Sequence, residues 1–279
     1  MTCRPPLRDI IARHGLDARR SLGQHFLLDA NLTARIVRAA GELEGRHVIE
    51  IGPGPGGLTR ALLDAGPLSV TAVEIDARAV AAINELAATD SRLKVVAGDA
   101  MAIDLAALVP APRQVVANLP YNVASPLLVK LLRQATAFDR LTLMFQQEVA
   151  ERICAPPGSP AYGRLSVLAQ WTCDTAIVLR VPPAAFVPPP KVWSAVVSLT
   201  PRIAQPDAAS FAGMEHLTAV AFGQRRKMLR GALKTIGGEE LLIAAGINPT
   251  RRAETLTVDE FENLLTWIAR RAEEPNRRS

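Results

Sequence analysis

Residues 47–59 read HVIEIGPGPGGLT. The apolar residues at the start predict a short buried strand, the glycines predict a tight turn, and residues 58–64 predict a helix that ends before Gly66. A turn of this kind, at the carboxyl end of a strand, is where α/β proteins bind ligands. Three of its glycines match the dinucleotide-binding pattern G-x-G-x-x-G: Gly52, Gly54 and Gly57.

Two features nevertheless disfavour an NAD-dependent oxidoreductase. Pro53 and Pro55 remove two N–H donors that a pyrophosphate would need. Carboxylates at or near the strand ends would also repel a pyrophosphate, but they suit S-adenosylmethionine, which carries a sulfonium, an ammonium and ribose hydroxyls. We expect Glu74 to bind the ribose and Asp99 to lie near the adenine. The four carboxylates of this rim are Glu50, Glu74, Asp76 and Asp99, of which we interpret Asp76 as a solvated loop residue.

The order of the elements predicts an α/β fold. Strand-like segments alternate with helices, and right-handed crossovers between them give a parallel sheet with one common ligand rim. Two later strands close the sheet. The expected strands cover 48–51, 70–75, 93–96, 115–117, 141–145, 176–181 and 195–200, and the clearest helices cover 31–40, 58–64, 125–132 and 146–153. This combination resembles the class I methyltransferase fold.

The fourth strand stops at Asn118-Leu119-Pro120-Tyr121, because Pro120 cannot donate to a central ladder. The amide of Asn118 and the carbonyl of Leu119 can each accept a hydrogen bond from an adenine amino group, and this favours the pyramidal, more reactive nitrogen. Tyr121 offers a flat face for a base. These residues can also form an ordinary loop. Together they resemble the catalytic loop of adenine N6-methyltransferases.

Composition narrows the function classes. The chain has 279 residues, of which 49% are hydrophobic, enough for one large core and one small one. No apolar run approaches a membrane span, and residues 1–20 lack the apolar core of a signal peptide. We therefore expect a cytoplasmic protein without a membrane partner. The three cysteines have no disulfide or zinc spacing, and we expect no metal.

The net charge of +5 comes from the two ends of the chain. Residues 1–28 carry five Arg against two Asp, residues 29–201 are balanced, and residues 202–279 carry twelve basic against ten acidic side chains. We expect a basic lead-in over 1–28, a methyltransferase domain over 29–201 and a small helical RNA-binding domain over 207–279. In a helix expected over 222–234, one face would carry Arg226, Arg230 and Lys234, with Arg225 and Lys227 beside it.

Two further features have open interpretations. His25 can reach a cofactor or pack beside Phe26. The proline-rich segment 186–194 can aim Phe186 and Lys191 at one site, or it can be a stiff linker.

Taken together, the motifs resemble the ribosomal RNA adenine dimethyltransferase family, and within it the group that acts on the small subunit. The similarity spans residues 20 to 265. The motifs are Gly23-Gln-His-Phe-Leu27, Glu50-Ile-Gly-Pro-Gly54, Val73-Glu-Ile-Asp76, Gly98-Asp-Ala100, Asn118-Leu-Pro-Tyr121, Ala161-Tyr-Gly-Arg-Leu-Ser166, Phe186 through Ser194 and Phe222-Gly-Gln-Arg-Arg-Lys227.

The resemblance implies S-adenosylmethionine as cofactor and two adjacent adenines of a small-subunit (16S) rRNA hairpin as substrate, each dimethylated late in subunit assembly. It implies that Phe186 and Tyr121 sandwich the target base. Separately from the resemblance, we expect a monomer. Two residues depart from the family pattern, His25 in place of Asn and Trp193 in place of Asp. The cofactor contacts implied are His25, Leu27, Gly52, Glu74, Asp99 and Asn118.

Two rival functions stay open beside the oxidoreductase. One is an adenine methyltransferase of large-subunit rRNA, of the antibiotic-resistance type. The other is a mainly non-enzymatic factor for small-subunit assembly.

Overall fold

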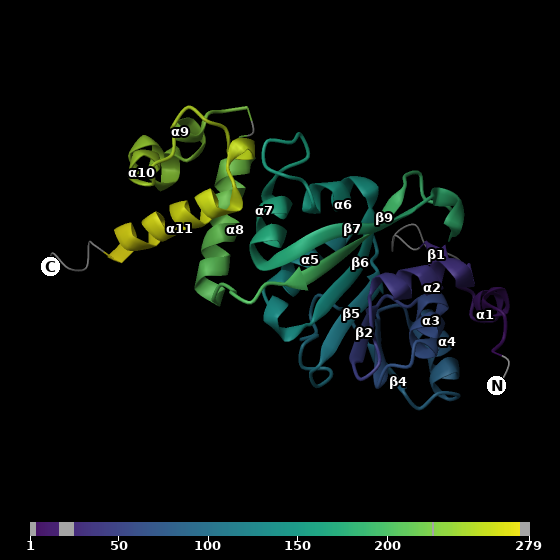
Figure 1. Cartoon of the computed structure of the whole chain (residues 1–279). Helices are drawn as coiled ribbons and strands as arrows, with labels where there is room; N and C mark the ends of the chain where they lie inside the picture. The colour runs from purple at the N-terminus through teal and green to yellow at the C-terminus, as the bar shows by residue number, and fades with distance from the viewer. Residues whose placement is uncertain (1–3, 17–24, 225, 274–279) are drawn as a thin grey trace. The chain divides into compact units, whose positions relative to one another are not determined.

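The main sheet is mostly parallel, as the sequence predicts. The computed structural model describes residues 4–16, 25–224 and 226–273 (Figure 1). Its seven-stranded sheet has the order β4-β3-β2-β5-β6-β9-β7, and a separate two-stranded sheet pairs β1 with β8. Neighbouring strands from β4 to β6 are parallel, whereas β9 is antiparallel to β6. The strands are β1 (Phe26–Leu27), β2 (His47–Ile51), β3 (Ser69–Glu74), β4 (Leu93–Ala97), β5 (Arg113–Asn118), β6 (Arg140–Gln146), β7 (Cys173–Val181), β8 (Phe186–Val187) and β9 (Ser194–Pro201).

Helices cover this sheet on both faces. In Figure 1, α2, α3 and α4 lie on one side and α5 lies on the other. The helices are α1 (Leu7–Arg13), α2 (Ala30–Ala39), α3 (Gly57–Asp64), α4 (Ala77–Ala87), α5 (Ala124–Leu132), α6 (Gln147–Ile153), α7 (Arg164–Thr172), α8 (Ala208–Gly223), α9 (Leu229–Ala232), α10 (Gly238–Ala244) and α11 (Val258–Glu273), with short 3-10 turns η2 (Ala135–Ala137), η3 (Pro183–Ala185), η4 (Lys234–Ile236) and η5 (Ala253–Thr255).

Local chemistry explains where these elements begin. Asp29 caps α2 by accepting a 2.8 Å hydrogen bond from the Asn31 N–H. Asp76 caps α4 in the same way, and its carboxylate also pairs with Arg78 at 2.6 Å. Asp76 is buried, so the expectation of a solvated loop residue is wrong. It positions the helix that follows the acidic rim.

One predicted helix, over residues 222–234, does not form as a single element. The helix α8 ends at Gly223, and α9 begins only at Leu229. The Leu229 N–H donates to the Arg251 carbonyl at 2.7 Å, so a segment distant in sequence takes the donor that a continuous helix would use. The basic residues of this region therefore do not share one helical face.

The chain divides into two compact units. One comprises Met1–Ala150 with Asp174–Pro201, and the other comprises Glu151–Cys173 with Arg202–Ser279. The expected domains of 29–201 and 207–279 stay a prediction. In the structure, residues 151–173 belong to the second unit. In the second unit the Trp171 ring stacks on Phe211 at 6.3 Å, and Tyr162 meets Phe222 edge-on at 6.1 Å. The first contact joins α7 to α8, and the second joins the turn before α7 to the end of α8. Among the described residues, no helix is long and apolar enough to cross a membrane.

A close backbone contact positions β1 over the start of α3. A Cβ atom added to Gly57 would lie 2.2 Å from the carbonyl oxygen of Leu27, well inside van der Waals contact. Gly54, earlier in the same loop, packs similarly against the Phe26 ring, at 3.0 Å from an added Cβ. The glycine-rich turn thus lets the β1–β8 sheet lie directly against the first βα unit.

We expect Gly57→Ala to lower the free energy of unfolding by about 2 kcal/mol or more, because its methyl group would displace the Leu27 carbonyl. Urea denaturation followed by circular dichroism measures this change. Gly223→Ala is the control, since an added Cβ there meets nothing within 4 Å. Equal stability of the two variants would contradict the proposed contact.

Candidate active site

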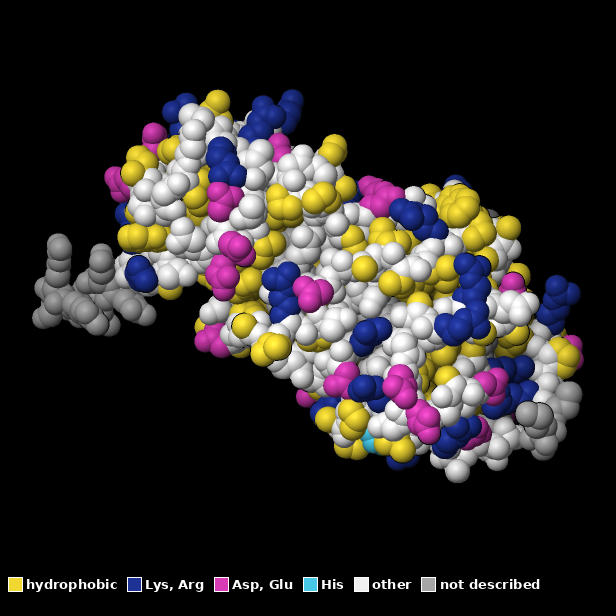
Figure 2. Space-filling view, viewed as in Figure 1, with side chains coloured by type: hydrophobic (Ala, Val, Ile, Leu, Met, Phe, Trp, Pro, Cys, Tyr) yellow, Lys and Arg dark blue, Asp and Glu magenta, His cyan; other side chains and the backbone are white. Residues whose placement is uncertain are grey.

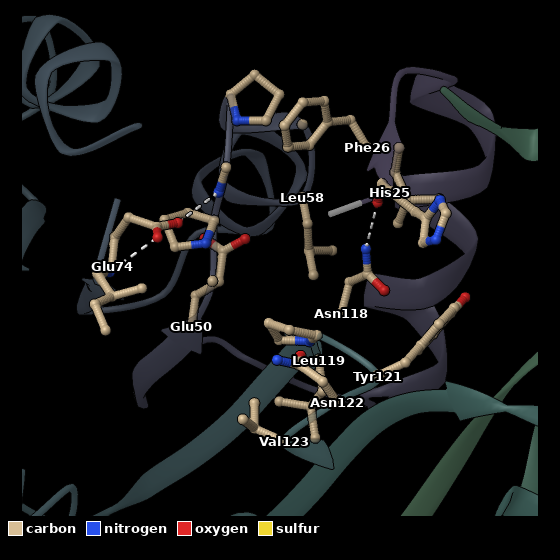
Figure 3. Close-up of a pocket in the computed structure, with 18 of the residues that line it drawn as sticks. His25, Phe26, Glu50, Leu58, Glu74, Asn118, Leu119, Tyr121, Asn122 and Val123 are labelled. Carbon is tan, nitrogen blue, oxygen red and sulfur yellow. Dashed lines mark hydrogen bonds between the residues drawn. The ribbon is translucent and has the colours of Figure 1, made fainter. Parts of the chain in front are cut away.

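The residues predicted for the cofactor and the catalytic loop line one cavity, with one exception. The cavity lies at the carboxyl ends of β2, β3 and β5 (Figure 3). Phe186 does not line it. The predicted residues that do are His25, Leu27, Gly52, Glu74, Asp99, Asn118, Leu119, Pro120 and Tyr121.

Glu74 is held at the end of β3 by main-chain donors. Its Oε1 accepts from the N–H groups of Ile75 and Asp76, both at 2.9 Å, and its Oε2 accepts from Gly54 N–H at 3.2 Å. Burial raises the pKa of Glu74, and these N–H groups oppose the rise. Oε1 already accepts two hydrogen bonds, whereas Oε2 accepts one and has a second lone pair, so Glu74 can still accept a hydrogen bond from a ligand hydroxyl at Oε2.

Glu50 is a buried carboxyl group with an unpaired oxygen. It is 1% exposed, and its Oε2 has no hydrogen-bond partner among the described residues. Burial raises the pKa of Glu50 to about 8, and the negative charge of Glu74 adds to the rise. A buried polar atom without a partner needs an explanation, and because Glu50 lines the cavity, a bound ligand can supply the missing partner.

Asn118 has a fixed orientation at the end of β5. Its Nδ2 donates to the main-chain carbonyl of His25 at 3.1 Å (Figure 3). The amide is therefore turned so that Oδ1, which has no partner among the described residues, stays available as an acceptor. The following residues pack on the glycine-rich turn, since a Cβ on Gly52 would lie 3.6 Å from Pro120.

Phe186 and Tyr121, the two residues expected to sandwich the target base, lie in different surroundings: Tyr121 lines the cavity and Phe186 is buried. Phe186 is only 2% exposed, pairs with Leu27 between β1 and β8, and belongs to the hydrophobic core. The His25 ring lies beside both aromatic rings, 5.4 Å from Tyr121 and 6.3 Å from Phe186. A sandwich of a base between Tyr121 and Phe186 stays a prediction.

Three contacts of this site have no counterpart in the sequence analysis. The His25 Nδ1 lies 2.8 Å from the Pro188 carbonyl, so segment 186–194 is anchored at the cavity. The Tyr121 hydroxyl lies 2.6 Å from the Ser194 hydroxyl, which fixes the ring edge. The Lys130 ammonium donates to the carbonyls of Ala100, Met101 and Ile103, and so holds the loop that carries Asp99. No local motif signals these pairings, because each joins residues far apart in sequence.

The predicted RNA-binding residues lie outside this cavity. Arg226 and Lys227 occupy the turn after α8, Arg230 is in α9, and Lys234 begins η4. All four are exposed, and Figure 2 shows Lys and Arg side chains at the surface around α9. Arg225 lies outside the described residues.

The cavity fits S-adenosylmethionine. Glu50, Glu74 and Asp99 line it, and no Lys or Arg does so among the described residues. Carboxyl groups without neighbouring cations suit a ligand that carries positive charge and hydroxyls. A hydroxyl or ammonium of such a ligand can also donate to the Glu50 Oε2, which has no partner among the described residues. The same described residues contain no group of three His, Cys, Asp or Glu side chains that could hold a metal ion.

The sheet order and this acidic cavity define a class I methyltransferase. The family model for ribosomal RNA adenine dimethylase matches residues 15–270. The chain therefore belongs to the ribosomal RNA adenine dimethylase family, and its methyl donor is S-adenosyl-L-methionine.

Individual relatives support this family assignment. The chain is 62% identical over 261 residues to the ribosomal RNA small subunit methyltransferase A of Gluconobacter oxydans, covering 93% of this chain and 86% of the relative. The protein of that name from Paramagnetospirillum magneticum is 59% identical, with 92% of each chain covered. A crystal structure of a dimethyladenosine transferase from Plasmodium falciparum matches with a TM-score of 0.74 and 26% identity, over 89% of this chain and 98% of that one.

We expect the stability of the cofactor-free protein to fall as pH rises from about 5 to about 8. The folded state holds a proton on Glu50 that the unfolded state, with an ordinary carboxyl pKa of 4.5, has released. Since the unfolded state binds fewer protons in this window, raising the pH favours unfolding.

Urea denaturation between these pH values tests the assignment. In the parent protein, the free energy of unfolding should fall by a few kcal/mol across this pH range because of Glu50, and Glu50→Gln should abolish that fall. The parent protein is the reference at every pH. Stability curves that stay parallel for parent and variant would show that Glu50 does not hold the proton.

Proposed function

We propose that this protein dimethylates the N6 atoms of two adjacent adenines in a hairpin of small-subunit (16S) rRNA, late in assembly of the small subunit. Relatives at 55–62% identity named ribosomal RNA small subunit methyltransferase A support this substrate. The observation that carries the chemistry is the fixed Asn118 amide, whose free acceptor lines the carboxylate-bearing cavity. We further propose that the protein is cytoplasmic and monomeric.

In this proposal the residues of the loop prepare the adenine amino group. The Asn118 Oδ1 and the Leu119 carbonyl accept its two N–H groups, which draws the nitrogen lone pair out of conjugation and directs it at the methyl group. Tyr121 stacks on the base, and burial raises the pKa of its hydroxyl, so it stays a neutral phenol. When bound, S-adenosyl-L-methionine supplies a methyl group on an already activated leaving group. Proximity and hydrogen bonding then account for catalysis without a dedicated base.

We propose that Glu74 binds the ribose of the cofactor and Asp99 lies near its adenine, with His25, Leu27 and Gly52 as further contacts. The Oε2 of Glu74 has one lone pair left for a hydroxyl donor, as described above. Asp99 is exposed in the cavity, where its Oδ1 accepts from the Met101 N–H at 2.8 Å.

We propose that the second unit binds the RNA backbone through the four described basic residues around α9. Exposed, clustered cations bind phosphates without reading sequence. Their placement on a turn and two short helices, rather than on one helical face, spreads them over a wider surface. Arg225, which lies outside the described residues, stays a predicted contributor to the same binding.

The rival functions have less support. A crystal structure of the 23S rRNA methyltransferase ErmE matches with a TM-score of 0.66 at 24% identity, which shows a shared fold and no more. A mainly non-enzymatic assembly factor would not need the oriented Asn118 amide. An Asn118→Ala protein that transfers no methyl group and still supports full maturation of small subunits would favour that rival.

We expect Asn118→Ala to lower methyl transfer about a hundredfold or more, since it removes an acceptor that acts on the reacting amino group. The measurement is transfer from labelled S-adenosylmethionine to small subunits that lack adenine dimethylation, with large subunits in parallel. Asn122→Ala, which changes a neighbouring side chain of the same cavity, is the control and should keep its activity within a few-fold. Label on large subunits would contradict the proposed substrate.

We expect charge reversal of Arg226 and Arg230 to weaken binding of small subunits and to flatten its salt dependence, by about one unit of log–log slope for each phosphate that the variant no longer neutralises. Binding is measured between low and high salt. Reversal of Arg270 and Arg271 in α11 of the same unit is the control. A variant slope equal to that of the parent would refute the role of the α9 region.

A further inference from the structure

Trp193 is an aromatic side chain without an internal role. Trp193 is 49% exposed. The other two tryptophans have partners, since Trp171 stacks on Phe211 and Trp267 lies under Arg270 at 5.6 Å. Among the described residues, the Trp193 indole has no ring partner and its N–H donates to no acceptor. Exposing so large an apolar surface costs free energy unless something covers it.

The backbone around Trp193 is fixed at both ends of its segment. On one side, Val187 pairs with Phe26 and the Pro188 carbonyl binds the His25 ring. On the other side, the Trp193 carbonyl accepts from the Gln147 N–H at 2.8 Å, which continues the β6–β9 ladder by one residue. The indole is therefore presented on a pre-organised support, so a ligand would not need to order it.

The position of Trp193 relative to the loop follows from strand geometry. The adjacent residue, Ser194, is buried and its hydroxyl meets the Tyr121 hydroxyl at 2.6 Å. The Gln147 N–H bond continues the β6–β9 ladder to Trp193, and successive side chains along a strand point to opposite sides, so we infer that the indole faces away from Tyr121. Trp193 is thus one residue from Ser194, on the other side of the chain from the proposed target base.

The neighbouring side chains favour a nucleotide as the covering group. Val192 is 45% exposed and adds apolar area, and Lys191 is exposed with no carboxylate partner among the described residues. An apolar face beside a free cation matches the base and the phosphate of single-stranded RNA. Figure 2 shows hydrophobic side chains at the surface around the segment that joins β7 to β9.

We propose that Trp193 stacks on a base that flanks the target adenine, with Lys191 at the adjoining phosphate. This inference rests on the proposed function, because it takes the rRNA that delivers the target adenine as the ligand. The stacking holds the flanking nucleotide outside the cavity while the target base is at Tyr121.

The first test compares Trp193→Ala with Trp193→Phe in methyl transfer to small subunits. Trp193→Ala should lower kcat/KM about tenfold, mostly through KM, because the contact lies away from the reacting atoms. Trp193→Phe keeps a stacking face and should stay within about threefold of the parent. The KM for S-adenosylmethionine should not change in either variant. Leu68→Ala is the control, since Leu68 is 54% exposed just before β3, at the opposite rim of the sheet.

Two results would overturn the proposal. One is a kcat/KM of Trp193→Ala equal to that of Leu68→Ala. The other is a photocrosslink from position 193 to a protein of the subunit rather than to a nucleotide next to the methylated adenines. Binding of small subunits by the same variants without cofactor tests the stacking even if the parent transfers no methyl group. Failure of the proposed function is thereby distinguishable from failure of the stacking.

Discussion

The site depends on one close approach of two backbones, that of Gly57 to the Leu27 carbonyl. It lets β1 cross the start of α3, and β1 in turn brings the His25 carbonyl to the Asn118 amide. The pairing of β1 with β8 then anchors the proline-rich segment whose far end holds Tyr121 through Ser194. A side chain in place of the Gly57 hydrogen would separate these layers. The glycine therefore serves backbone packing more than ligand approach.

The second organising feature is a pair of carboxyl groups kept out of water. Glu50 and Glu74 both lie at strand ends beneath the cavity, and burial raises both pKa values. Three main-chain N–H groups donate to Glu74 and offset the cost of its burial. The unpaired oxygen of Glu50 has no such donor among the described residues. Glu74 is held ready for hydrogen bonds, whereas Glu50 gains its missing partner only from a ligand or a proton. This asymmetry makes the empty site less stable than a fully paired one.

The sequence predicted the features that depend on local patterns. The strands of the main sheet and the position of Asn118 follow from hydrophobic periodicity and the Pro120 break, both of which act within a few residues. The helix expected over 222–234 was wrong because the Leu229 N–H donates to Arg251, a partner that periodicity cannot reveal. The burial of Phe186 was not predicted for the same reason, since pairing of two-residue strands leaves no signal in sequence.

The division of the chain also bears on how such proteins can change over evolutionary time. The polypeptide passes from the first unit to the second after residue 150, returns after 173 and leaves again after 201. The RNA-binding unit proposed here is thus not a terminal module that a single recombination event could replace. An exchange that carried only residues 202–279 would leave Trp171 without Phe211, its stacking partner. Inheritance of the two segments as a pair is the simplest way to keep that core intact, so the two units are expected to diversify by point substitution rather than by shuffling.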